Sequence, residues 1–153
     1  ELFIYGFQNF YKNNEHITER LLPKNVQIFD AYENENPKNK GFGENLIIDY
    51  LLKINPDIVI IYNDILIIDM FIKQIRKIKD IKFKIIPYID IVYKNEKQEL
   101  LKNIDMNCDG GIMITDYWKN NIIQSNNFKK PLWVLEQGFN RTQYFRIPQF
   151  SAI

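Results

Sequence analysis

Apolar residues along this chain alternate between short runs rich in β-branched side chains and longer segments with a helical repeat. The short runs predict strands, and the longer segments predict helices that lie on a sheet. The predicted strands are Leu2 to Gly6, Val26 to Ala31, Ile58 to Tyr62, Lys84 to Tyr88, Gly111 to Thr115 and Leu132 to Glu136. This alternation predicts a Rossmann-like α/β domain, with three layers, a mainly parallel sheet and helices on both faces.

Two apolar stripes with helical spacing lie between these strands. One consists of Leu46, Ile47, Tyr50, Leu51 and Ile54, and the other of Ile65, Ile68, Ile72 and Ile75. Pro56 and Pro131 mark the entries to the third and sixth strands, because the residue before a proline avoids the helical region. The segment from Glu33 to Gly43 is rich in Asn, Pro, Lys and Gly, which favours a loop.

The composition indicates one globular domain, because 153 residues with 46% hydrophobic side chains can bury a core between a sheet and helices. The 20 basic and 19 acidic residues are mixed along the chain. No basic stripe is therefore available to neutralise phosphates, and we do not expect nucleic acid to be a partner. No apolar run reaches about 18 residues, so we expect a soluble protein without a transmembrane segment. The lone Cys108 suits a reducing, cytoplasmic setting.

Motifs for cofactors and metals are missing from the sequence. Neither a G-x-G-x-x-G after the first strand nor a phosphate-binding G-x-x-x-x-G-K-[ST] occurs. His16 lies in a predicted helix without a second metal ligand nearby, and no Asp-x-Asp pair is present, so we expect neither a metal nor a cofactor. The run from Gly41 to Glu44 is either a weak anion site or, with more support, a loop that leads into a helix. We expect Cys108 to be a buried, inert thiol.

Polar residues follow nearly every predicted strand. In an open parallel sheet, ligands bind beyond the carboxyl ends of the strands. The candidate substrate-binding residues at this edge are Gly6, Phe7, Gln8, Asn63, Asp64, Tyr88, Thr115, Asp116, Gln137 and Gly138, and Asp90 is the catalytic candidate. Amides, carboxylates and aromatic rings together suit the hydroxyl groups of a sugar. Asp64 and Asp116 each precede a helix, however, and either residue can serve as an N-cap.

Three passages extend this interpretation: KINPDIVIIYND from Lys53, CDGGIMITDYWKNNI from Cys108, and VLEQGFNRTQYF from Val134 to Phe145. In this order they resemble the N-terminal domain of GT-B-type glycosyltransferases, especially the retaining family that includes sucrose and mannosyl transferases. The resemblance implies that residues 1 to 145 form the acceptor-side domain and that residues 146 to 153 begin an interdomain linker.

The same resemblance implies the reaction. A hexose-type sugar would pass from a nucleotide-sugar donor, held mainly by a C-terminal domain, to a hydroxyl of a glycan, lipid or protein acceptor. With only one wall of the cleft, the fragment is expected to be inactive alone. Members of the family often carry a His after the fourth strand, where this chain has Tyr88 and Asp90, and Gln137 replaces the His of the closing turn. We therefore expect Asp90 to act on the acceptor hydroxyl.

Two other functions fit the pattern less well. The first is a receiver-like signalling domain with Asp64 as the phospho-acceptor, but the chain lacks an acidic pair after the first strand, where it reads YGFQN. The second is an α/β interaction module without catalysis, which agrees with the lack of a nucleophile next to a base.

Overall fold

The computed structural model describes residues 1–6, 25–36, 41–91 and 97–138, and it confirms the six predicted strands. Every strand begins at the predicted residue, and the ends differ by at most two residues. The elements are β1 (Leu2–Gly6), β2 (Val26–Asp30), α1 (Ala31–Asn34), α2 (Ile47–Ile54), β3 (Ile58–Asn63), α3 (Ile65–Ile75), β4 (Lys84–Ile89), α4 (Gln98–Asn107), β5 (Gly111–Met113), α5 (Asp116–Asn126) and β6 (Leu132–Val134).

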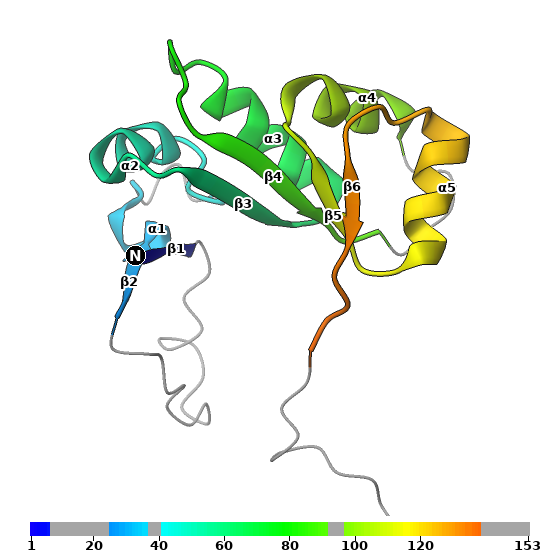
Figure 1. The fold of residues 1–153 in the computed structure, drawn as a ribbon. Helices are drawn as coiled ribbons and strands as arrows, with labels where there is room; N and C mark the ends of the chain where they lie inside the picture. Colours follow the sequence, from blue (N-terminus) through cyan, green and yellow to red (C-terminus); the bar gives the residue numbers. More distant parts are fainter. Residues whose placement is uncertain (7–24, 37–40, 92–96, 139–153) are drawn as a thin grey trace, which may run out of the picture.

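All strand pairs in the described residues are parallel, which confirms the predicted α/β class and agrees with a Rossmann-like fold. The strands belong to two sheets. One contains β1 and β2, and the other contains β3, β4, β5 and β6 in that order. Figure 1 shows the arrowheads of β3 to β6 gathered at one edge, which is the carboxyl edge of the larger sheet.

The larger sheet carries its helices on one face. Its side chains on that face, including Ile85, Ile89, Met113 and Leu132, belong to the same buried cluster as the apolar sides of α2 to α5. Figure 1 shows α3 and α4 next to each other behind β4 and β5. On the opposite face the described residues include no helix, and the predicted helix around His16 lies outside them. Side chains that point to that face are partly or largely exposed: Ile58, Ile60, Tyr62, Ile86, Tyr88, Ile112 and Trp133.

Helix α3 is the centre of the core. Seven of its residues are buried, and among them only Asp69 is polar. Asp69 forms an ion pair with Lys73 at 2.6 Å and accepts a hydrogen bond from Asn103 of α4. Because only Leu101 and Ile104 of α4 are buried, its apolar stripe is short, and the sequence pattern did not single this helix out.

Asp109 joins the start of β4 to the turn before β5. Its carboxylate accepts hydrogen bonds from Ile85 N and from Lys84 Nζ, both at 3.0 Å, and its own N–H donates to Ile85 O at 2.9 Å. Partial burial of Asp109 raises its pKa. The hydrogen bonds from Ile85 N and Lys84 Nζ, together with the positive charge of Lys84, have the larger effect, so the pKa of Asp109 is lowered. The ionised carboxylate therefore stabilises the fold.

We predict that Asp109→Asn lowers the free energy of unfolding by about 0.2 to 1 kcal/mol at pH 7, the range of exposed ion pairs. Because the folded pKa lies below the unfolded value of about 3.9, this contribution is present above that pH and is lost as the pH falls through the folded pKa. Urea unfolding between pH 7 and pH 2 measures it. Lys84→Met is the control that breaks the pair from the other side. A difference between wild type and Asp109→Asn that stays constant down to pH 2 would contradict this role.

Candidate functional site

The predicted site residues of β3 to β6 lie at the carboxyl edge of the larger sheet. Asn63 ends β3, Tyr88 is the last but one residue of β4, and Asp90 follows β4 directly. Thr115 and Asp116 lie where β5 leads into α5, and Gln137 and Gly138 follow β6. Gly6 ends β1 in the smaller sheet. Phe7 and Gln8 lie outside the described residues.

Two of these residues serve as helix caps. Asp64 Oδ1 accepts hydrogen bonds from Leu66 N at 2.9 Å and from Ile67 N at 3.0 Å, so Asp64 is the N-cap of α3. At α5 the cap is Thr115, whose Oγ1 accepts from Trp118 N at 3.3 Å. The N-cap interpretation is therefore confirmed for Asp64 and wrong for Asp116, which is an exposed residue of the first turn. α5 begins at Asp116, so the residue directly before it, Thr115, is at the N-cap position, and its hydroxyl is a suitable acceptor there.

The carboxylate of Asp90 does not cap any of the described helices. Its backbone N–H donates to Asn63 O at 3.0 Å, which extends the β3–β4 pairing by one residue and places Asp90 beside Asn63. Asn63 Oδ1 in turn accepts from Asp64 N at 2.9 Å. The Asp90 side chain is half-buried and forms no hydrogen bond or ion pair with any described residue. Among the described residues, none competes for this carboxylate.

Tyr62 and Tyr88 form an aromatic pair at the same edge, on the face without described helices. Their ring centroids lie 5.0 Å apart in an edge-to-face arrangement. Tyr88 Oη donates to Leu135 O at 2.5 Å, and Gln137 Nε2 donates to Tyr62 Oη at 2.6 Å. These two hydrogen bonds connect the segment after β6 to Tyr88 of β4 and Tyr62 of β3, and they place Gln137 beside the tyrosine pair.

Tyr62 was not among the predicted site residues. The sequence did contain a signal, because Tyr62 interrupts an aliphatic strand directly before the polar residue that ends it. A hydroxyl at such a position needs a partner or water. Gly138 was predicted, but it is exposed, and a Cβ added there would meet no atom within 4 Å, so packing does not require a glycine at this position.

The run from Gly41 to Glu44 uses its backbone groups internally. Gly41 N donates to Glu35 at 2.9 Å, and Phe42 N donates to Glu44 at 3.1 Å. Tyr5 Oη donates to Gly43 O, and burial together with the charges of Glu35 and Glu44 raises the pKa of Tyr5, so this hydroxyl stays protonated. Two carboxylates thus bind two of the amides that an external anion would need, which favours the loop interpretation of this run.

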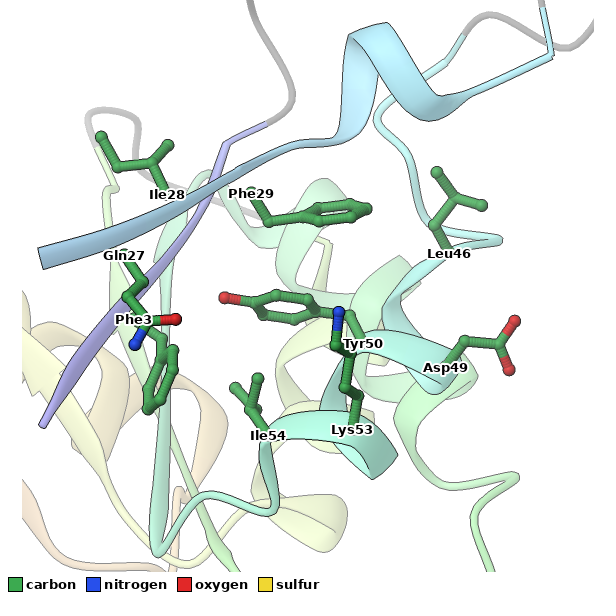
Figure 2. Close-up of a pocket in the computed structure, with 9 residues that line it drawn as sticks. All are labelled: Phe3, Gln27, Ile28, Phe29, Leu46, Asp49, Tyr50, Lys53 and Ile54. Carbon is green, nitrogen blue, oxygen red and sulfur yellow. The ribbon is translucent and has the colours of Figure 1, made fainter.

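A hollow of about 310 Å³ lies between α2 and the smaller sheet. Figure 2 shows the rings of Phe29 and Tyr50 close together beside it, with Asp49 turned away. Phe3 and Gln27, which also line it, are paired near the starts of β1 and β2, so the hollow lies away from the carboxyl edge. Gln27 Nε2 donates to Glu1 Oε1 at 2.6 Å. We assign no ligand to this hollow.

Cys108 is buried, as the sequence predicted. Burial raises the pKa of its thiol to about 11, so it is not a thiolate at neutral pH and is a poor nucleophile. Within the described ranges, no cluster of three or more His, Cys, Asp or Glu residues is arranged to hold a metal ion. In those ranges, too, every helix is too short or too polar to cross a membrane.

No protein-family model matches this chain, and no curated protein matches it either. The resemblance to glycosyltransferases stays a prediction from the sequence. The structure shows the α/β fold and the residues at the carboxyl edge of its larger sheet, where ligands bind in folds of this kind.

We predict that Asp64→Ala lowers the free energy of unfolding by about 0.5 to 2 kcal/mol, because two amides of α3 lose their acceptor. Asp64→Asn keeps a side-chain oxygen at this position and should retain most of that stability. Denaturant unfolding of both variants measures the effect. Asp116→Ala, at the start of α5, is the control and should change stability by less than about 0.5 kcal/mol. Equal losses for Asp64→Ala and Asp64→Asn would show that charge, and not capping, is what matters at Asp64.

Proposed function

We propose that this chain is the acceptor-side domain of a GT-B-type glycosyltransferase that transfers a hexose-type sugar to a hydroxyl group. The observation that carries this assignment is the Asp90 carboxylate, which lies at the ligand-binding edge of a parallel sheet without a partner among the described residues. A carboxylate in such a position can accept the proton of an acceptor hydroxyl or orient that hydroxyl. The sequence resemblance supplies the reaction class.

The tyrosine pair supports a sugar as the ligand. Both hydroxyls are bound to the segment after β6, so each ring is held in place. Tyr62 is 51% exposed, and an exposed aromatic ring offers a flat apolar surface to the C–H groups of a sugar. Asn63 adds an amide beside Asp90, and amides bind sugar hydroxyls by donating and accepting hydrogen bonds. The edge therefore combines a base with a stacking surface and polar contacts.

The charges near β1 support a donor site elsewhere. Glu35 and Glu44 accept hydrogen bonds from the backbone amides of Gly41 and Phe42, and like charge disfavours a diphosphate at that place. In the family that the sequence resembles, the nucleotide is held mainly by the C-terminal domain. Both considerations assign this chain the acceptor rather than the nucleotide.

The receiver-like alternative has less support. Phosphorylation of Asp64 would compete with its cap, because Oδ1 already accepts from two amides of α3. An interaction module without catalysis would not need the negative charge of Asp90. Substitution of Asp90 therefore distinguishes this alternative from a transferase.

In a protein that joins this chain to its donor domain, we predict that Asp90→Asn lowers kcat by about 10²- to 10⁴-fold, the usual contribution of a general base. The amide keeps the size of the side chain but cannot accept a proton. Asp57→Asn, next to the amino end of β3, is the matched control and should leave kcat unchanged. Initial rates with saturating donor and acceptor measure the effect. A kcat for Asp90→Asn close to that of wild type would remove Asp90 from the mechanism.

For residues 1–153 alone, we predict no turnover of nucleotide sugars and at most weak binding of a nucleotide. The carboxylates of Glu35 and Glu44 already bind the amides of Gly41 and Phe42, and their negative charge disfavours a diphosphate there. Calorimetric titration with a panel of UDP- and GDP-sugars tests this prediction, and a coupled assay tests turnover. Submicromolar affinity for any of these donors would show that the nucleotide site lies in this domain.

A further inference from the structure

Two carboxylates meet at the run from Gly41 to Glu44. Glu35 Oε2 accepts a hydrogen bond from Gly41 N at 2.9 Å, and Glu44 Oε2 accepts one from Phe42 N at 3.1 Å. A Cβ added to Gly41 would lie 3.1 Å from Glu44 Oε2, so both carboxylates lie next to Gly41. Two negative charges in one place repel each other, and a bound positive charge would relieve this repulsion.

The Glu35 carboxylate is buried, and one of its oxygens has no partner. Glu35 is only 7% exposed, and its Oε1 forms no hydrogen bond with any described residue. Within the same residues, neither Glu35 nor Glu44 forms an ion pair with a basic side chain. Buried carboxylates are as a rule paired with a positive group or bound to a metal ion. The Glu35 side chain therefore indicates a positively charged ligand.

The backbone around the two carboxylates is held in place by Gly43. Its φ of +70° is left-handed, and a Cβ there would lie 2.4 Å from Ala31 Cβ, so no other residue fits. Its carbonyl oxygen accepts hydrogen bonds from Tyr5 Oη and, at 2.9 Å, from Leu46 N. The run is thus fixed against the end of β1 and the start of α1, and a ligand would find its carboxylates already positioned.

The cluster also lies at an edge where ligands are expected. Tyr5 is the last but one residue of β1, and Ala31 directly follows β2, so the run packs at the carboxyl edge of the smaller parallel sheet. Figure 1 shows α1 beside β1. Burial, and after it the charges of Glu35 and Glu44, raises the pKa of Tyr5, which places both carboxylates near the Tyr5 hydroxyl.

The chemistry of the cluster selects a hard cation. Its side-chain donors are carboxylate oxygens, which suit Ca²⁺ and Mg²⁺ better than the soft metals that thiolates bind. Ca²⁺ accepts about six to eight oxygen ligands in irregular geometry, with water and backbone carbonyls beside carboxylates, whereas Mg²⁺ needs a nearly ideal octahedron. Because only two carboxylates take part, we expect a weak site, with a Kd of about 10⁻⁴ to 10⁻³ M.

We propose that Glu35 and Glu44 together bind one Ca²⁺ ion beside Gly41, through the oxygen atoms that accept no hydrogen bond from described residues. The ion would hold the run from Gly41 to Glu44 against β1. Because its charge only balances the two carboxylates, the run gains no net positive charge that would attract a diphosphate. The site takes no part in sugar transfer, and its test needs no sugar.

Titration of residues 1–153 with Ca²⁺, followed by amide NMR signals, tests this site. Binding should saturate, and the signals of Gly41 and Phe42 should be among those that shift most, because their amides bind the same two carboxylates. Glu35→Gln and Glu44→Gln should each weaken Ca²⁺ binding at least about 10-fold, since each removes one negative charge from the ion. Both amides keep an oxygen that can accept the existing hydrogen bond.

Glu33→Gln is the matched control. Glu33 is exposed, and its loss removes the same charge from a position close to Glu35 in the chain. Solvent and salt screen an exposed charge, so this variant should bind Ca²⁺ within about 2-fold of wild type. A loss of affinity in only one of Glu35→Gln and Glu44→Gln, or in neither, would overturn the shared site. Circular dichroism without Ca²⁺ checks that each variant folds.

Thermal unfolding of the unaltered chain gives a second measurement that no substitution can disturb. A ligand that binds only the folded state raises Tm as its concentration rises, so Ca²⁺ should raise Tm, and Mg²⁺ at the same concentration should raise it less. No change in Tm and in the Gly41 and Phe42 signals up to about 10 mM Ca²⁺, ten times the weakest Kd expected, would overturn the proposal. Glu35 would then be neutralised by a proton instead.

Discussion

The packing of α3 against β3 and β4 is the constraint on which the rest of this structure depends. α3 contacts α2, α4 and both strands, and six of its aliphatic and aromatic side chains are buried. Burial of one such side chain contributes about 1.5 to 3 kcal/mol, so this helix accounts for a large part of the apolar stabilisation. Asp64 caps the start of α3, so the carboxyl end of β3 lies at the N-terminus of this helix.

This arrangement decides which polar groups at the edge remain available. Asp64 and Thr115 look like ligands in the sequence, but the helix that follows each of them uses one of its side-chain oxygens, Asp64 Oδ1 and Thr115 Oγ1, as a cap. Asp90 directly follows β4, and none of the described helices uses its carboxylate as a cap. A functional role is therefore best sought at Asp90 and at the tyrosine pair that the segment after β6 holds in place.

Aromatic rings link the smaller sheet to the helices that pack on the larger sheet. Tyr5, Phe29, Tyr50 and Phe71 form a chain of ring contacts from β2 through β1 and α2 to α3. Next to these rings, the Tyr5 hydroxyl and the carboxylates of Glu35 and Glu44 bind backbone groups of Gly41, Phe42 and Gly43. The aromatic cluster thus connects the smaller sheet to the helices that cover the larger one.

The sequence by itself determined the local structure of this protein. β-branched runs bounded by Pro56 and Pro131 located the strands, and Asp64 marked the start of α3, because strand periodicity and capping depend on neighbours along the chain. The tertiary structure alone decided the division into two sheets, the bond between Gln137 and Tyr62 across 75 positions, and the use of the glycine run by Glu35 and Glu44. It also left the Asp90 carboxylate without a partner among the described residues. Such outcomes depend on which groups meet in space, and local patterns carry no information about competition between distant hydrogen-bond partners.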